Sequence, residues 1–439
     1  MVMWKLVKVR GLAPTLPSWM EHASVKDAES VKNVAEIIRL FPGEPLVVVI
    51  SAMGKTTNGL EKVVKAHCSK TGEAISFLQE VRAYHDTILE SLFPNSNASV
   101  YGKVNNFFVE IDWVLEEEPR SFDFVYDQIV SIGELISTTI VQSYLDEQGI
   151  ACKWLDIRDC IHTDNTYREG KVDWVESEKR IKQIIPTLIN DRNPIVVTQG
   201  FIGATSENFT TTLGREGSDY TAAIIAHLLD GESVTIWKDV PGVLNADPKY
   251  FNDAQKLEQL SYHDAIELAY YGASVIHPKT IKPLENKNIP LYVKSFLQPQ
   301  GKGTIVGKDL TTKPQVPSFI FKSDQVLVSL AAKDFAFIAE DNLSSIFATF
   351  AACGVKMNLM QNSAISFSVC FDDDKYKTSK LIDLLKKEYW VRYNEGLQLY
   401  TIRYYYPSTI ENLSQGREIL LEQRSRTTAQ LVMKEIIAS

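Results

Sequence analysis

Short apolar runs that alternate with helical patterns constrain the fold of this 439-residue chain more than any other feature. Near-continuous apolar runs such as Pro45–Ile50 and Pro194–Thr198 are typical of parallel strands that are covered on both faces. Helical patterns such as Val25–Leu40 and Asp127–Tyr144 lie between them. This alternation favours an α/β sandwich with a mainly parallel central sheet. Further strands are predicted at Trp4–Val9, Ala151–Asp156, Ser233–Trp237 and Pro290–Lys294.

The composition limits the class of protein and its partners. A net charge of -9 gives no electrostatic support for binding nucleic acid or an anionic membrane. No apolar run approaches the roughly 18 residues of a membrane helix, and the first residues lack the apolar core of a secretion signal. The five cysteines include no C-x-x-C pair, which indicates idle or buried thiols in a reducing compartment. We therefore expect a cytoplasmic protein without nucleic-acid or membrane partners.

The pattern changes after a linker rich in glycine and proline near residue 310. Two cycles of strands and helices follow, which indicate a weak internal repeat of a small ligand-sensing unit. The first cycle is predicted to read β-α-β-β and then a helix, and the second to end in a helix at Ala429–Ile437. The predicted domains are residues 1–305, 318–392 and 393–439.

The run Thr210–Asp219 places an arginine, a serine and an aspartate on a loop with two glycines, just after an apolar strand. Arg215 can hold a carboxylate with two parallel hydrogen bonds. Ser218 and Asp219 add a hydroxyl and an anion, and the following helical pattern would direct free N–H groups at the loop. The loop predicts a site for a small carboxylate substrate near phosphate.

Two other segments carry candidates for the same site. Ser51–Gly59 contains Gly-Lys-Thr after a strand, but a P-loop would need glycine where Val49 stands. The alternatives are a substrate loop that uses Ser51 and Thr57, or a plain polar turn. Glu134 lies amid apolar residues of a helix, where it could bind an ammonium group or lie on a solvated stripe.

Three more segments allow a functional or a structural interpretation. The turn-rich run after the strand at Ser233–Trp237 offers Lys238, Asp239 and Lys249 to a nucleotide, or is a solvated loop. His277 precedes a proline at a turn, where a structural role is favoured over acid–base chemistry. Met357–Phe367 joins two strands as an effector pocket or as a plain hairpin.

Taken together, these runs resemble the aspartate kinases of the amino acid kinase superfamily. The resemblance extends from about Ser24 to the C-terminus. It implies an amino acid kinase sandwich followed by two ferredoxin-like (βαββαβ) ACT domains. Six motifs appear in the family's order: Ser51–Asn58, Gly133–Ser137, Thr198–Gly203, Thr212–Thr221, Asp239–Gly242 with Asp247-Pro248, and His277-Pro278.

The resemblance implies ATP-dependent phosphorylation of the β-carboxylate of L-aspartate, the first step toward lysine, threonine and methionine. It also implies Mg²⁺ carried by the nucleotide, an amino-acid effector (threonine or lysine) and a homodimer through the ACT domains. No separate metal site is implied. By matching positions, the resemblance implies that the substrate contacts Thr57, Glu134, Arg215 and Ser218, and that the catalytic residues are Asp219 and Lys8. It implies that the nucleotide contacts Lys238, Asp239, Lys249, Ser274 and Val275. An effector would contact Met357, Asn358, Ser363 and Ile365.

The chain departs from the family at its first strand. The family opens with Lys-Phe-Gly-Gly-Thr-Ser-Val, whose lysine neutralises the transferring phosphate, whereas here Lys8 stands without Gly-Gly-Thr and residues 9–22 lack a clear pattern. The alternatives are a crippled or retuned kinase, a non-catalytic amino-acid-binding regulator, or a reading-frame error in this span. Lysine-inhibited relatives carry acids at the positions of Asn358 and Ala364, so threonine or no effector is favoured over lysine.

Overall fold

The computed structural model describes residues 4–8, 25–273, 276–333 and 337–436. The chain divides into two compact units, which are described separately. The first comprises residues 1–243, 256–266 and 275–312, and the second comprises residues 244–255, 267–274 and 313–439.

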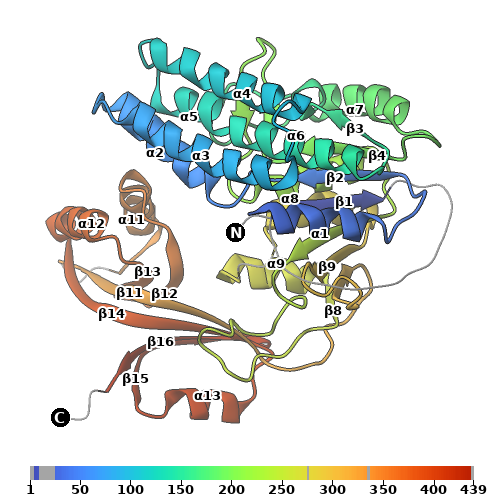
Figure 1. Cartoon of the computed structure of the whole chain (residues 1–439). Helices are drawn as coiled ribbons and strands as arrows, with labels where there is room; N and C mark the ends of the chain where they lie inside the picture. The colour runs from blue at the N-terminus through green and yellow to red at the C-terminus, as the bar shows by residue number, and fades with distance from the viewer. Residues whose placement is uncertain (1–3, 9–24, 274–275, 334–336, 437–439) are drawn as a thin grey trace. The chain divides into compact units, whose positions relative to one another are not determined.

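An eight-stranded mixed sheet forms the centre of the first unit (Figure 1). Five of its strands, β3, β4, β2, β7 and β9, run in one direction, while β1, β10 and β8 run in the other. All six strands predicted from the sequence are present within one or two residues at each end. In spatial order the strands are β3 (Cys152–Leu155), β4 (Ile195–Gln199), β2 (Leu46–Ile50), β1 (Trp4–Lys8), β7 (Ser233–Lys238), β9 (Leu291–Ser295), β10 (Thr304–Gly307) and β8 (Gln259–Ser261).

Helices cover this sheet and bury its apolar strands. Every residue of β2 and β4 is buried, as expected for strands packed on both faces. The helix α6 (Ile132–Glu147) packs across β2, β3 and β4, while α8 (Gly217–Leu228) packs on β1, β2 and β7. The other helices are α1 (Ala28–Ile38), α2 (Thr56–Cys68), α3 (Ala74–Leu92), α4 (Ser99–Glu116), α5 (Phe122–Val130), η1 (Ile157–Asp159), α7 (Trp174–Leu188), α9 (Tyr262–Tyr271) and α10 (Pro278–Lys287).

The stretch Phe122–Glu147, which contains α5 and α6, corrects one expectation from the sequence. It is long and apolar enough to cross a membrane by length and composition alone. However, 89% of its most apolar window is buried inside the protein. The stretch is therefore a core element of the sandwich, and its low polarity reflects packing against β2, β3 and β4.

The second unit is built on a six-stranded antiparallel sheet in the order β12-β13-β11-β14-β16-β15. The second half of β11, then α11, β12, β13, α12 and the first half of β14 form a βαββαβ cycle. The first half of β11 pairs with the second half of β14, so the second cycle takes a strand from residues before 325. The bounds are β11 (Ser318–Ala332), α11 (Glu340–Ala352), β12 (Met357–Asn362), β13 (Ser366–Asp372), α12 (Lys375–Glu388), β14 (Tyr389–Arg403), α13 (Pro407–Ser414), β15 (Arg417–Arg424) and β16 (Thr428–Glu435).

The prediction of a helix at Ala429–Ile437 is wrong, because β16 occupies that segment as a strand between β14 and β15. Ala429, Leu431 and Met433 pack into one core cluster, while Val432 packs into another. Apolar residues on both faces of a strand produce a continuous apolar run that periodicity alone does not distinguish from a buried helix.

Candidate active site

Polar loops gather at the carboxyl edge of the parallel strands β2 and β4. The backbone N–H of Gly200, just after β4, donates to the carbonyl of Ile50 at the end of β2, with 3.0 Å between nitrogen and oxygen. The hydroxyl of Ser137 on α6 donates to the carbonyl of Ser51 at 2.7 Å. Ligands of open α/β sheets bind outside this edge, so the structure brings two predicted loops and the Glu134 helix to the expected place.

Two glycines allow these segments to touch. A Cβ atom on Gly200 would lie 2.4 Å from the Cβ of Ser218, and one on Gly133 would lie 2.9 Å from the Cγ2 of Thr56. Because real Cβ atoms essentially never approach so closely, only glycine fits at either position. The start of α8 therefore abuts the end of β4, and the start of α6 abuts the start of α2, which lies within the Ser51–Gly59 segment.

The predicted substrate residues differ in their exposure. Glu134 and Ser218 are buried, at 3% and 7% exposure, and Asp219 is fully buried at 0%. Thr57 is half-buried and Arg215 is exposed. Within the described ranges, Arg215 has neither an ion pair nor a hydrogen bond, so its guanidinium group is available to an external carboxylate. Ser218 and Asp219 lie in the first turn of α8, whose N-terminal dipole favours an anion.

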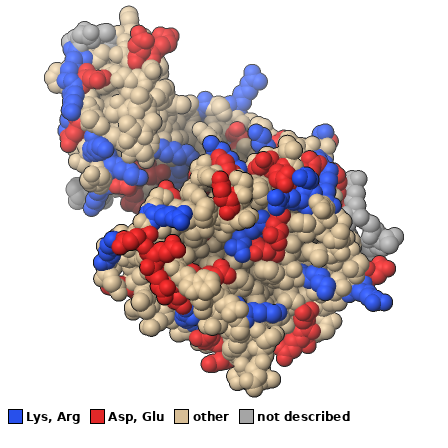
Figure 2. All heavy atoms as spheres, turned by 90° about the horizontal axis from the view of Figure 1, so that it is seen from above, with Lys and Arg blue, Asp and Glu red and all other residues tan. Residues whose placement is uncertain are grey.

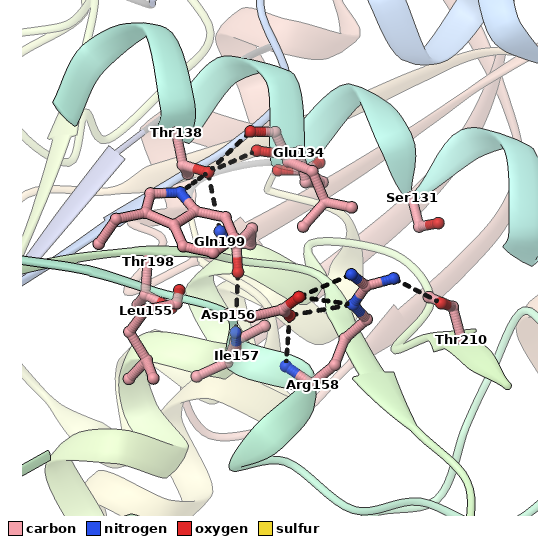
Figure 3. A network of polar contacts seen from close by, with 12 residues as sticks. Ser131, Glu134, Thr138, Leu155, Asp156, Ile157, Arg158, Thr198, Gln199 and Thr210 are labelled. Carbon is pink, nitrogen blue, oxygen red and sulfur yellow. Dashed lines mark hydrogen bonds and ion pairs between the residues drawn. The ribbon is translucent and has the colours of Figure 1, made fainter. Parts of the chain in front are cut away.

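A buried polar network holds α6 against the strands (Figure 3). The Thr138 hydroxyl accepts hydrogen bonds from Trp154 Nε1 at 3.0 Å and Gln199 Nε2 at 2.8 Å, and donates to the carbonyl of Glu134 at 3.0 Å. Gln199 Oε1 in turn accepts from the N–H of Ile157 at 2.8 Å. A fully satisfied buried network of this kind fixes one arrangement of its elements, so it sets the position of α6 and of Glu134.

A second network supports the strand that precedes the arginine loop (Figure 3). Arg158 donates to both carboxylate oxygens of Asp156, at distances of 2.6 to 3.1 Å, and its Nη1 reaches Thr210 Oγ1 at 3.2 Å. Thr210 begins β6 (Thr210–Thr212), which pairs with β5 (Ile202–Ala204). The sequence analysis missed Arg158 and Thr138. For Arg158, the sequence did contain a signal, because this arginine stands two residues after an aspartate that ends a predicted strand.

The register of β1 does not bring Lys8 to this edge. Lys8 pairs with Leu46 and Ser233, the first residues of β2 and β7, whereas Trp4 pairs with Ile50 and Trp237 near their ends. The structure therefore places the backbone of Lys8 at the opposite edge of the sheet from Ser218 and Glu134. Because β1 runs antiparallel to both of its neighbours, its register does not support Lys8 as a catalytic residue, and this assignment stays a prediction.

The predicted nucleotide residues are only partly described. Lys238 ends β7 and is buried at 2% exposure, level with the edge where Ser51 follows β2. Asp239 follows it and is exposed. Lys249 is exposed in a segment of the second unit. Ser274 and Val275 lie outside the described residues. Their assignment to a nucleotide stays a prediction.

The remaining motifs take structural roles or stay open. His277 is the N-cap of α10, and its Nδ1 accepts from the N–H of Lys279 at 3.1 Å. Val49, where a P-loop needs glycine, lies inside β2, so the Ser51–Gly59 segment lacks a phosphate cradle of that type. Among the residues that the structure describes, no cluster of three or more His, Cys, Asp or Glu side chains could hold a metal ion.

The four predicted effector residues fall into two pairs on one hairpin. Met357 and Asn358 begin β12, whereas Ser363 and Ile365 lie at the turn into β13. Ser363 comes five positions after Asn358 along an extended chain, which amounts to roughly 17 Å. Asn358 accepts from Lys322 Nζ and donates to Gln325 Oε1, both at 2.8 Å. The pairs therefore do not form one pocket within a single chain, and the effector assignment stays untested.

The fold and site together define an α/β protein whose polar loops gather at the carboxyl edge of a mainly parallel sheet, where ligands of such sheets bind. The model of the amino acid kinase family matches residues 22–295. Lysine-sensitive aspartokinase 3 of Escherichia coli is 30% identical over 86% of this chain and 84% of its own length. The chain belongs to the amino acid kinase family and, within it, to the aspartokinases.

Other relatives agree with this placement. Aspartokinase 1 of Arabidopsis thaliana is 32% identical over 82% of this chain and 64% of its own length. The chain spans 42% of a bifunctional aspartokinase/homoserine dehydrogenase of the same plant, at 30% identity. The crystal structure of E. coli aspartokinase III with lysine and aspartate superposes with a TM-score of 0.78 at 26% identity, covering 94% of both chains. The complex of that enzyme with aspartate and ADP gives 0.76 at 27% identity and 93% coverage of both.

Proposed function

We propose that this chain transfers the γ-phosphoryl group of ATP to the β-carboxylate of L-aspartate and releases 4-phospho-L-aspartate and ADP. The observation that carries the proposal is the contact of the Glu134 helix, the Ser51–Gly59 loop and the first turn of α8 at one sheet edge. The relationship to aspartokinases supplies the substrate, because solved relatives hold aspartate and ADP.

In this proposal the two ends of aspartate are held by groups of opposite charge. Arg215, exposed and without an ionic partner among the described residues, binds the α-carboxylate through two parallel hydrogen bonds. Glu134 lies in an apolar stretch of α6, where its charge attracts the α-ammonium group. Thr57 and Ser218 add hydroxyl groups. Held at both ends, aspartate presents its β-carboxylate oxygen as the nucleophile.

Phosphoryl transfer needs alignment and charge neutralisation more than covalent help from the protein. The N-terminal dipole of α8 favours the anionic part of the site. Lys238 lies level with this edge and contributes positive charge near the phosphates, with Asp239 directly after it along the nucleotide. Magnesium carried with ATP would offset the negative charge of the phosphates. Asp219 orders the reacting groups beside Ser218.

The test is ADP release in a coupled assay with purified protein and Mg-ATP, with and without aspartate. Aspartate-dependent release supports the proposal. The matched variants are Arg215→Lys, which keeps the positive charge but removes the two-pronged guanidinium group, and Glu134→Gln, which keeps the size but removes the negative charge. Each is expected to raise the KM for aspartate by at least tenfold, because one charge-assisted contact contributes about 1.5–3 kcal/mol. The proposal is wrong if neither variant changes this KM.

A non-catalytic amino-acid-binding regulator is the second candidate, and the register of β1 favours it. That register pairs the backbone of Lys8 with Leu46 and Ser233, at the other end of the strands from Ser51 and Lys238, so it does not favour Lys8 as the lysine that neutralises phosphate. This candidate predicts aspartate binding without ADP release, so the same assay with calorimetry separates the two functions. A homodimer through the second unit, an amino-acid effector and a cytoplasmic location remain proposals that accompany either function.

A further inference from the structure

Asp127 on α5 is a buried carboxylate that no sequence motif singled out. Its side chain is fully buried, at 0% exposure. One oxygen, Oδ2, accepts hydrogen bonds from the backbone N–H groups of Arg168 and Thr212, both at 2.9 Å. The other, Oδ1, accepts from the hydroxyl of Thr212 at 2.7 Å. One carboxylate thus joins three segments that are more than 40 residues apart in the sequence.

These contacts reach the arginine loop through Thr212, the last residue of β6. Leu213, Gly214 and Arg215 follow directly, so the position of Thr212 sets where the loop starts. The Thr212 carbonyl also accepts from the N–H of Gly170 at 2.8 Å. Gly214 has φ +77°, and a Cβ there would lie 3.3 Å from the carbonyl oxygen of Arg168. Asp127 therefore holds both the strand before the loop and the segment that packs against its glycine.

Burying a carboxylate lowers the stability of the fold unless hydrogen bonds or an opposite charge replace its lost hydration. Burial raises the pKa of Asp127 to about 6, against the opposing effect of the hydrogen bonds from Arg168 and Thr212 and the charge of Arg168. At neutral pH the group is mostly ionised and supplies only acceptors. Two of the groups that face it are N–H donors and the third is a hydroxyl that donates here, so an ionised carboxylate serves all three, whereas an amide would carry no charge and would require the hydroxyl to accept.

We propose that Asp127 is a positioning residue for aspartate binding, which fixes Thr212 so that Arg215, three residues later, meets the substrate carboxylate. The inference rests on the proposed function for the identity of the substrate. Asp127 acts through Thr212 and Arg168 and does not itself touch the substrate. The effect is therefore expected on the affinity for aspartate and not on the affinity for the nucleotide.

The decisive variant is Asp127→Asn, which keeps the shape but removes the charge from the acceptor of the two N–H groups and directs an NH₂ group at the Thr212 hydroxyl, which then has to accept. We expect the KM for aspartate to rise on the order of tenfold to a hundredfold, as for a lost charge-assisted hydrogen bond, with the KM for ATP within about twofold. Thr212→Val removes one of the three bonds and Thr212→Ser keeps it, so the valine variant is expected to be weaker in aspartate binding than the serine variant.

Asp164→Asn is the matched control for general disturbance of the Arg168 segment. Asp164 is an exposed carboxylate that accepts from the N–H groups of Thr166 and Lys171, at 3.1 and 3.0 Å. It makes no hydrogen bond to Thr212 among the described residues. The control is expected to leave both KM values within about twofold. Melting temperatures of all four variants show whether a loss of binding is a loss of folding.

The outcomes separate this inference from the proposed function. Three results would overturn the inference while the kinase activity stands. The first is an unchanged KM for aspartate in Asp127→Asn, and the second is an equal rise of the KM values for aspartate and ATP in that variant. The third is an equal rise of the KM for aspartate in the Asp164→Asn control. If the wild type releases no ADP, calorimetric titration with aspartate replaces the KM. Weaker binding by Asp127→Asn than by wild type then supports the inference without the activity. A wild type that does not bind aspartate overturns both.

Discussion

The buried imidazole of His85 on α3 gives a sharp prediction about stability against pH. His85 is fully buried, at 0% exposure. Its Nδ1 lies 2.7 Å from the carbonyl of Val81, so this nitrogen carries the proton and donates. The Nε2 atom lies 3.3 Å from the hydroxyl of Thr56 and accepts from it. Burial lowers the pKa of His85 from 6.5 to about 4. The folded protein therefore requires a neutral ring.

The sign of the pH dependence follows from this lowered pKa. As the pH falls below 6.5, the unfolded chain binds a proton at His85, and the folded chain does so only near pH 4. The contribution of His85 to stability is thus complete above pH 6.5 and is lost as the pH falls toward 4. Linkage between these two pKa values gives a loss of about 2 kcal/mol between roughly pH 7.5 and 5.

The assay compares the free energy of unfolding of wild type and His85→Gln in urea from pH 7.5 to 5. Other titrating groups contribute equally to both proteins, so their effects cancel in the difference. The stability advantage of wild type is expected to shrink by about 2 kcal/mol over this range. His67→Gln is the control, because burial lowers the pKa of half-buried His67 as well but the ring is far less enclosed. A difference that stays constant with pH refutes the neutral-ring argument.

Two further predictions concern the glycine contact and the effector. Gly200→Ala is expected to lower kcat/KM for aspartate at least about tenfold, because the new Cβ would lie 2.6 Å from the Cα of Ser218 and force the start of α8 to move. Gly102→Ala, with nothing within 4 Å of its Cβ, is the matched control, and equal activities would contradict the argument. Calorimetry with lysine is expected to show no micromolar binding, since Asn358 offers an amide already bonded to Lys322 and Gln325 in place of a carboxylate. Micromolar affinity would reverse this expectation.

The sequence predicted those parts of the fold and site that depend on local patterns. The continuous apolar runs at Leu46–Ile50 and Ile195–Gln199 predicted buried strands, and the polar residues after them predicted the site edge.

Other parts depend on contacts between distant segments, which periodicity does not carry. Asp127 meets Thr212 across 85 residues, and Thr138 meets Gln199 across 61. Neither pair has a local signature. The direction of β1 is also a tertiary property, because antiparallel pairing with β2 and β7 sets the backbone of Lys8 level with the first residues of both strands.

The most direct test of the central claim is chemical trapping of the product. Purified protein is incubated with Mg-ATP, L-aspartate and hydroxylamine, which converts an acyl phosphate into a hydroxamate. The account predicts aspartate β-hydroxamate in amounts equal to the ADP released, and a strong loss of both in Arg215→Lys and Glu134→Gln. ADP release without hydroxamate, or hydroxamate on the α-carboxylate, would contradict it.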